Sequence, residues 1–260
     1  MKANPFDLQG RRLWVIGGAG YLGQSVVRLL ARLGAEVLCA DLPGKAAAFV
    51  ESVQPGAAVR AADFDITDTD AAPAWIARQI EAYGTPHGVA VLTYASTAKK
   101  LDDLSAAEFD LVNHGNLTST FVFAREIGRC MAANDGGSIA LFSSMYGTVS
   151  PDPAIYEPPM NTNPLEYGVN KAGIQQMARY LAVHFGAQNV RCNSVSPGPF
   201  PNPALQRDNP AFIARLSKKV PLGRVGQADE IAGAVAFLLG DASSFVNGVN
   251  LPVDGGWTAW

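Results

Sequence analysis

Short apolar runs alternate along this chain with longer stretches in which apolar residues recur every three or four positions. The short runs are residues 12–16, 35–40, 57–62, 89–92, 138–142, 190–196 and 249–253. Runs of this length, bounded by glycine, proline or polar residues, indicate buried strands, whereas the intervening period indicates amphipathic helices. Strands that alternate with helices predict an α/β fold built on a parallel sheet.

Two helical stretches are longer than the others, residues 105–134 and 167–185. The first begins with Ser105 and Glu108 at capping-box spacing, which predicts a helix start at that point. Asn116 interrupts the same stretch. Because asparagine is a poor residue for the middle of a helix, we expect a kink or a polar contact there. One or two short helices are expected between residues 209 and 239.

Composition and charge exclude several classes of protein. At 260 residues the chain can bury a sizeable core and is most simply one domain, residues 1–260. The net charge is −3 and the basic residues are scattered, which argues against a nucleic-acid partner. No apolar run reaches membrane-spanning length, and the first residues lack the apolar core of a signal peptide. We therefore expect a cytoplasmic protein without a membrane partner.

The cysteines and histidines predict no metal site. These six residues are dispersed along the chain: Cys39, Cys130, Cys192, His87, His114 and His184. They lack the spacing of metal ligands, and the cysteines lie inside apolar segments, so we expect the thiols to be reduced core residues.

A glycine-rich turn follows the first strand and opens the first helix. It reads Gly17-Gly18-Ala19-Gly20-Tyr21-Leu22-Gly23. Between a strand and a helix, glycines let the backbone approach a pyrophosphate, and the helix N-terminus offers unpaired N–H groups and a positive dipole. The turn therefore predicts a dinucleotide site. Its expected contact residues are Gly17, Gly20, Tyr21, Leu22 and Gly23.

The second strand ends in an acidic residue, Asp41, eighteen residues beyond Gly23. A carboxylate in this position can accept hydrogen bonds from both ribose hydroxyls but would repel a 2′-phosphate. No lysine or arginine lies in the glycine turn or directly after Asp41, and Lys45 is the nearest cation. The pattern favours NAD over NADP. The alternative is that Asp41 only caps the turn that follows it.

Four residues of chemical interest follow strands: Gly17, Asp41, Ala95 and Ser144. In open α/β sheets, ligands bind at the carboxyl ends of the strands. We therefore expect these four residues to lie at one edge of the sheet.

Tyr167 and Lys171 are four residues apart in the second long helix, so their side chains share a face. A nearby cation favours the phenolate and lowers the pKa of a tyrosine from its usual value of about 10. A tyrosine tuned in this way can exchange a proton with an alcohol or carbonyl oxygen.

With these motifs in this order, the sequence resembles the short-chain dehydrogenase/reductase family, specifically its single-domain branch. The similarity runs from about Arg11 to Gly256. The resemblance implies a Rossmann-type, doubly wound, seven-stranded parallel sheet in three α/β/α layers. It also implies a bound nicotinamide cofactor and hydride transfer between that cofactor and a secondary alcohol or ketone.

The resemblance assigns the reaction to four residues. Tyr167 would be the general acid/base, and Lys171 would lower its pKa and hold the nicotinamide ribose. Ser144 would hydrogen-bond the substrate oxygen. Asn116 would hold the water of a proton relay beside Lys171.

The resemblance also extends the cofactor site. Asp65 would contact the adenine amine, with the Ile66 backbone beside it, and Ala95 would belong to the floor under the cofactor. The segment expected to close over the nicotinamide carboxamide contains Pro197, Gly198 and Phe200.

Several positions depart from the family pattern. Ile16 stands for the usual threonine, Tyr21 for a second glycine, and Asn202 for a threonine that contacts the carboxamide. The usual Asn-Asn-Ala-Gly is replaced by residues 93–96, Thr-Tyr-Ala-Ser, which puts the local turn in doubt.

The spacing between serine and tyrosine also departs from the family. Tyr167 lies 23 residues after Ser144, which is longer than usual. Tyr156 is nearer the common spacing, but Met160 stands where its lysine should be. Tyr167 is therefore the predicted acid/base.

The extra residues, 152–166, belong to a proline-rich loop expected beside the substrate opening. Their polar members are Glu157, Asn161, Thr162 and Asn163. We hypothesise that they meet the hydroxyls of a sugar, sugar acid or polyol, as in gluconate-5-dehydrogenase-like enzymes and oxidoreductases of surface-sugar biosynthesis. The alternative is a long surface loop that does not touch substrate.

Two other functions remain open. One is a nicotinamide-binding sensor or scaffold with little catalysis, although such a protein has no need of all four catalytic residues. The other is a sugar-nucleotide epimerase or dehydratase of the related larger branch, which usually carries a substantial C-terminal substrate domain. We also expect a homotetramer assembled through the helices that begin near Ser105 and Tyr167. Trp257 and Trp260 could pack on a neighbouring subunit or cover their own core.

Overall fold

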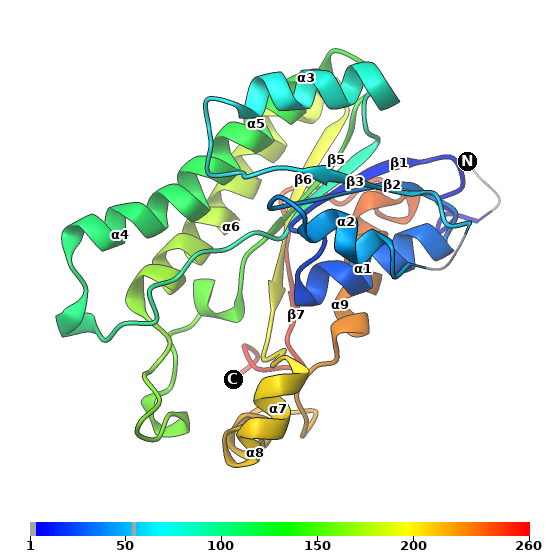
Figure 1. Ribbon diagram of the computed structural model, residues 1–260. Coiled ribbons are helices and arrows are strands. Elements are labelled where there is room, and N and C mark those ends of the chain that lie inside the picture. The colour runs from blue at the N-terminus through cyan, green and yellow to red at the C-terminus, as the bar shows by residue number, and fades with distance from the viewer. Residues whose placement is uncertain (1–3, 54–55) are drawn as a thin grey trace.

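A computed structural model describes residues 4–53 and 56–260 of the chain (Figure 1). Its centre is a seven-stranded sheet in the order β3-β2-β1-β4-β5-β6-β7, with parallel pairing throughout. The strands are β1 (Arg12–Ile16), β2 (Glu36–Asp41), β3 (Val59–Asp63), β4 (Gly88–Val91), β5 (Gly137–Phe142), β6 (Val190–Pro197) and β7 (Asn250–Val253). All the predicted strands are present, and the Rossmann-type, doubly wound sheet is confirmed.

Helices cover both faces of the sheet. They are α1 (Tyr21–Arg32), α2 (Lys45–Val50), α3 (Ala72–Tyr83), α4 (Ala106–Asn113), α5 (Ser119–Ala132), α6 (Leu165–Phe185), α7 (Pro203–Asp208), α8 (Pro210–Lys219) and α9 (Ala228–Leu239). Apolar side chains of α1 and α9 form one buried cluster with the strands. Those of α3, α5 and α6 form another cluster with the strands. Figure 1 shows these three helices on the other side of the sheet from α1 and α9. The predicted three-layer arrangement is confirmed.

The first strand explains why the strands read as unbroken apolar runs. Leu13 and Val15 of β1 pack in the cluster under α1 and α9, whereas Trp14 and Ile16 pack in the cluster under α3 and α5. Each of the four is at most 1% exposed. A strand buried on both faces has no polar alternation.

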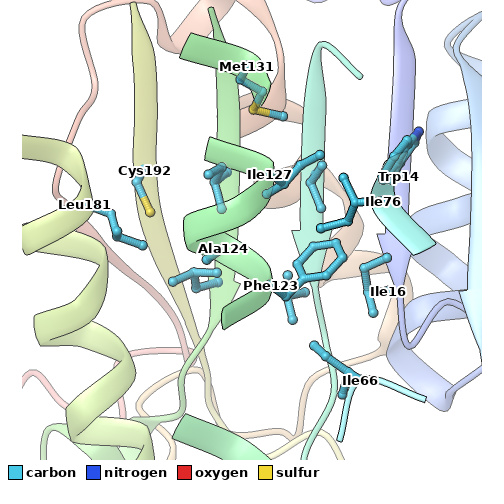
Figure 2. Close-up of a cluster of buried hydrophobic side chains, with 14 of the residues drawn as sticks. Trp14, Ile16, Ile66, Ile76, Phe123, Ala124, Ile127, Met131, Leu181 and Cys192 are labelled. Carbon is cyan, nitrogen blue, oxygen red and sulfur yellow. The ribbon is translucent and has the colours of Figure 1, made fainter. Parts of the chain in front are cut away.

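The cluster under α5 is drawn in Figure 2. Phe123, Ile127 and Met131 are spaced four residues apart, point from α5 toward the sheet and are fully buried. They belong to one cluster with Trp14 of β1 and Cys192 of β6. Burying a side chain of this kind contributes about 1.5–3 kcal/mol, so this face fixes α5 against the strands that carry the site.

The helical region that begins at Ser105 has the predicted start and the predicted interruption. The Ser105 hydroxyl accepts a hydrogen bond from the Glu108 N–H, and the Glu108 carboxylate accepts one from the Ser105 N–H at 3.0 Å. Between α4 and α5 the chain forms a π-helical turn, His114–Thr118. Such turns widen the helix by one residue and occur often at functional sites. Asn116 lies in this turn and makes the polar contacts described below.

Two short helices escaped prediction. α2 and α7 have six residues each, too few to show a helical period. α8 and α9 are the two short helices expected between residues 209 and 239. α6 starts at Leu165, two residues earlier than the pattern suggested.

Among the described residues, no helix is both long and apolar enough to cross a membrane. In the same part of the chain, no three histidine, cysteine, aspartate or glutamate side chains gather closely enough to bind a metal ion. The three cysteines are free thiols, and Cys39 and Cys192 are buried in the core as predicted.

Candidate active site

The glycine turn between β1 and α1 is too tight for larger residues. Gly17 has a φ of +81°, which side-chain-bearing residues rarely adopt. A Cβ atom on Gly23 would lie 2.2 Å from the Gly17 carbonyl oxygen, and one on Gly18 would lie 2.7 Å from the Cys39 sulfur. Gly20 precedes α1, whose first N–H groups belong to Tyr21, Leu22 and Gly23. The turn therefore fits the backbone cradle that a pyrophosphate requires.

Asp41 lies at the end of β2, directly beside this turn. One carboxylate oxygen accepts a hydrogen bond from the Ala19 N–H at 3.0 Å, and the other accepts one from the Leu42 N–H at 2.9 Å. The second contact is the capping role considered from the sequence. Each oxygen keeps a further lone pair, so the capping role leaves ribose recognition open.

Asp65 and Ile66 follow β3, the edge strand next to β2. One Asp65 oxygen accepts hydrogen bonds from the N–H and hydroxyl of Thr67, at 2.9 and 2.7 Å, so the carboxylate shapes its own turn. The Ile66 side chain is buried in the core, and its backbone lies three residues after the end of β3. Both residues therefore lie just beyond the carboxyl end of β3.

Asn116 ties the π-helical turn to the loop after β4. Its side-chain oxygen accepts a hydrogen bond from the Ala95 N–H at 2.9 Å, and its amide nitrogen donates to the Ala95 carbonyl at 2.8 Å. The same nitrogen donates to the Val112 carbonyl at 3.0 Å. The Asn116 side chain thus holds Ala95 against the π-helical turn, and the Asn116 backbone carbonyl accepts a hydrogen bond from the Ser119 N–H.

Ser144, Tyr167 and Lys171 come together where β5 meets α6. The Ser144 side chain lies close enough to Tyr167 to lower the pKa of the tyrosine by hydrogen bonding. The Lys171 ammonium nitrogen lies 5.6 Å from the centre of the Tyr167 ring and donates to the Phe142 carbonyl at 2.9 Å. The helix places lysine and tyrosine on one face, as the four-residue spacing predicted.

The electrostatics differ from the sequence expectation in one respect. Burial raises the pKa of Tyr167, and the Ser144 hydrogen bond offsets this only in part. Burial also lowers the pKa of Lys171, to about 8. The pKa of Tyr167 is therefore raised in this structure and not lowered as predicted, because desolvation dominates.

Tyr156, the other candidate for the acid/base, has a structural partner of its own. Its hydroxyl is 2.7 Å from the hydroxyl of Tyr146, and its ring packs against Phe212 of α8. Burial raises its pKa. Lys171 lies beside the ring of Tyr167, which favours Tyr167 as the acid/base.

Pro197 ends β6, and Gly198 and Phe200 follow it in a tightly packed segment. The Gly198 N–H donates to the Val253 carbonyl at 2.9 Å, and a Cβ atom on Gly198 would lie 2.5 Å from the Asp254 Cα atom. Asn202 accepts a hydrogen bond from the Leu205 N–H at 2.9 Å and so caps α7. Its side chain is engaged there.

Residues 152–164 are fastened to α8 and to the loop after β4. Glu157 forms an ion pair with Arg215 at 2.8 Å, and Asp152 forms one with Lys219. The Asn161 amide donates to the Ala98 carbonyl at 3.1 Å. Glu157 and Asn161 are thus already engaged within the protein. Thr162 and Asn163 line a cavity of about 780 Å³ that Lys99 and Tyr156 also line.

Two residues beside the cluster were missed as site residues. Tyr94 lies with its ring edge-on to Tyr167, with centroids 6.4 Å apart and planes at 88°. Glu166 is fully buried directly before Tyr167. Tyr94 was visible in the sequence as a departure from the family motif, but a glutamate in the first turn of a helix gives no signal of burial.

The fold and the Ser-Tyr-Lys cluster together are those of an oxidoreductase with a Rossmann-type sheet. The family model described as "Enoyl-(Acyl carrier protein) reductase" matches residues 18–258. The chain belongs to the short-chain dehydrogenase/reductase family.

Individual relatives agree with this assignment. The chain is 33% identical over 249 residues to cis-4-hydroxycyclohexanecarboxylate dehydrogenase of Sinomonas cyclohexanicum, covering 94% of this chain and 95% of that protein. It is 30% identical over 262 residues to gluconate 5-dehydrogenase of Gluconobacter oxydans (strain 621H), covering 97% and 96%. A short-chain dehydrogenase of Leptospira borgpetersenii, solved with bound NAD⁺, has a TM-score of 0.84 at 28% identity and covers 99% and 96%. The predicted likeness to gluconate-5-dehydrogenase-like enzymes is confirmed.

Proposed function

We propose that this protein is an NAD(H)-dependent dehydrogenase, one catalytic domain of residues 1–260, that interconverts a secondary alcohol and a ketone on a polar, hydroxylated substrate. The observation that carries the proposal is the meeting of Ser144 and Tyr167 beside Lys171. This cluster lies at the sheet edge that also holds the glycine turn and Asp41.

In this proposal Ser144 and Tyr167 both act on the reacting oxygen. Ser144 holds it by a hydrogen bond, and Tyr167 takes the hydroxyl proton during oxidation or returns it during reduction. A bound nicotinamide would accept or supply the hydride at the carbon that bears this oxygen. The two side chains lie near each other, which supports a shared role at one substrate oxygen.

Lys171 supplies the positive charge that the phenolate needs. With a pKa near 8 it is mostly protonated at neutral pH, although it is buried. Its charge favours deprotonation of Tyr167 against the effect of burial, and a cofactor ribose within its reach would compete with the Phe142 carbonyl for the ammonium. We assign the backbone carbonyl of Asn116 to a relay water, because the Asn116 side chain holds Ala95.

The choice of NAD rests on Asp41. Its carboxylate stands beside the glycine turn, where a 2′-phosphate would meet a negative charge. We assign the pyrophosphate to Gly17, Gly20, Tyr21, Leu22 and Gly23, the adenine to Asp65 and Ile66, and the carboxamide to Pro197, Gly198 and Phe200. Lys171 and Ala95 complete the proposed cofactor site.

The substrate class follows from the relatives and from the polar surroundings. Two of the relatives are named for a hydroxylated acid, a cyclohexane derivative in one and gluconate in the other. We propose a sugar, sugar acid or polyol. Direct hydroxyl recognition is assigned to Thr162 and Asn163, since Glu157 and Asn161 are engaged with Arg215 and Ala98.

We also propose a homotetramer. Exposed apolar side chains lie along the outer faces of α4, α5 and α6: Leu111, Phe121, Leu165, Val169, Tyr180 and Val183. A second copy of the chain would cover them, and a monomer in analytical ultracentrifugation at micromolar concentration would refute this. Trp257 is buried in its own subunit, whereas Trp260 is exposed. The free thiols support a reducing compartment and hence the proposed cytoplasmic location.

The test is NADH formation from NAD with sugar acids, polyols, cyclic hydroxy acids and simple secondary alcohols. Tyr167→Phe should abolish turnover and keep NADH binding, whereas Tyr83→Phe, a change at an exposed tyrosine of α3, should leave both intact. Replacing NAD with NADP should lower kcat/KM. If no substrate class turns over while NADH binds tightly, the dehydrogenase proposal fails and the sensor alternative replaces it.

A further inference from the structure

Glu166 is a buried carboxylate without a charged partner. It is 0% exposed and takes part in none of the ion pairs among the described residues. One oxygen, Oε1, accepts hydrogen bonds from the Thr97 N–H at 3.0 Å and the Thr97 hydroxyl at 2.8 Å. The other, Oε2, has no partner among them. A carboxylate left half satisfied in the interior is a poor way to gain stability, which indicates another use for it.

The segment that Glu166 holds is unusual in conformation. The Thr97 hydroxyl also accepts a hydrogen bond from the Lys99 N–H at 3.2 Å. Between them, Ala98 has a φ of +57°, in the left-handed region that alanine seldom adopts. Asn161 donates to the Ala98 carbonyl. A strained backbone of this kind persists only where its surroundings fix it, and Thr97 and Ala98 are both held by hydrogen bonds from other segments.

Tyr94 directly precedes Ala95, which Asn116 holds, and lies three residues before Thr97, which Glu166 holds. Its ring is 71% exposed, so packing gives it little support of its own. Nevertheless it stands edge-on to Tyr167. The backbone near Tyr94 is held through Ala95 by Asn116 and through Thr97 by Glu166. Since Glu166 and Tyr167 are neighbours in α6, the same helix carries the acid/base and anchors the loop that faces it.

We propose that Glu166 is a positioning residue: through Thr97 it holds the Tyr94 ring beside Tyr167, where that ring forms a wall of the substrate site. The ring offers an apolar face to the carbon skeleton of the substrate, while Ser144 and Tyr167 address its reacting oxygen. The proposal rests on the proposed function for the role of Tyr167. In this chain, Glu166 and Thr97 stabilise a loop whose family motif has been replaced.

The first test is amide hydrogen exchange of residues 93–100, which needs no turnover. We compare wild type with Glu166→Ala, Glu166→Gln and the surface control Glu81→Ala. Of these three variants, only Glu166→Ala should raise the amide exchange rate of this segment, by about tenfold or more. A segment opens locally more often when it loses the contacts that hold it. Glu166→Gln keeps an acceptor oxygen for Thr97 and should stay near wild type. Unchanged exchange in Glu166→Ala, or an equal rise throughout the protein, would overturn the proposal.

A second variant covers the case in which Glu166→Ala does not fold. Thr97→Val removes the hydroxyl, which donates to Glu166 and accepts from the Lys99 N–H, and keeps the hydrogen bond from the Thr97 N–H to Glu166. It should raise exchange of residues 93–100 to a smaller extent. No rise in that variant would count against the clamp.

The third test is a double-mutant cycle in kcat/KM. Glu166→Ala and Tyr94→Ala should each lower kcat/KM by about 10- to 100-fold, mostly through KM, because a misplacement of about 1 Å costs as much as 10²-fold. If Glu166 acts through Tyr94, the double variant should lie within about twofold of the worse single variant. Losses that multiply would refute the link. An inactive wild-type protein would refute the proposed function instead, and the exchange result would then decide the role of Glu166.

Discussion

Replacing Lys171 with methionine should change how the stability of the protein depends on pH. Lys171 is 3% exposed, and burial lowers its pKa from 10.5 to about 8. Between these two values the unfolded chain binds more protons than the folded one, so the free energy of unfolding of the wild type rises with pH across that window. Below pH 8 the cost of burying the charged lysine is present in full.

The size of the effect follows from the two pKa values. The cost is about 3 kcal/mol at pH 7 and about 1 kcal/mol at pH 9.5, because most of the folded protein has by then lost the proton. Methionine has a similar length and no charge, but leaves the Phe142 carbonyl without its donor, at about 1–2 kcal/mol at every pH. The stability of Lys171→Met relative to wild type should therefore fall by about 2 kcal/mol between pH 7 and 9.5.

The assay is urea unfolding, followed by tryptophan fluorescence, of wild type and Lys171→Met at several pH values from 7 to 9.5. Titrations elsewhere in the protein cancel in the difference between the two. Lys218→Met, an exposed change on α8, is the matched control and should run parallel to wild type. Parallel curves for Lys171→Met would refute the reasoning, because they would mean that the buried lysine has its ordinary pKa. Lys171→Met should also lose turnover, so the Lys171 charge should prove necessary for catalysis although it lowers the free energy of unfolding.

Three further changes test other parts of the site. Asn116→Ala removes three hydrogen bonds from a buried residue and should lower the free energy of unfolding by about 3 kcal/mol, measured by urea unfolding, with faster amide exchange around Ala95. Gly23→Ala would place a Cβ atom 2.2 Å from a backbone oxygen of the glycine turn, and should weaken NADH binding, measured by fluorescence titration, by more than about tenfold. Glu157→Gln breaks an exposed ion pair with Arg215 and should cost less than about 1 kcal/mol. If its KM is also unchanged, Glu157 does not contact substrate.

The strands and the glycine turn could be predicted because their causes are local. Apolar runs such as β1 must be buried on both faces, and the close approach between Gly17 and Gly23 admits no side chain at Gly23. The interruption at Asn116 could also be predicted, since asparagine in a helix needs a reason. Its partner, Ala95, lies 21 residues away along the chain and could not be identified from the residue type alone.

Other parts of the site depend on contacts between distant segments. Glu157 appeared free to bind hydroxyls until the structure placed Arg215 beside it. Asn202 was noted only as a departure from the family threonine, and its role as a cap of α7 depends on a helix too short to show a period. The direction of the Tyr167 pKa shift is a balance between burial and neighbouring groups, and spacing reveals only the neighbours.

Cys39, whose thiol packs against Gly18 of the glycine turn, can be used to measure how often that turn opens. Cys39 is 0% exposed, lies where a Cβ atom on Gly18 would reach, and has its pKa raised to about 12 by burial. Alkylating reagents attack the thiolate, so the folded protein should resist them at this position. The rate at which a thiol reagent labels Cys39 therefore reports how often the turn opens. Comparing this rate with and without NADH measures how much the bound nucleotide stabilises the first βα unit against opening.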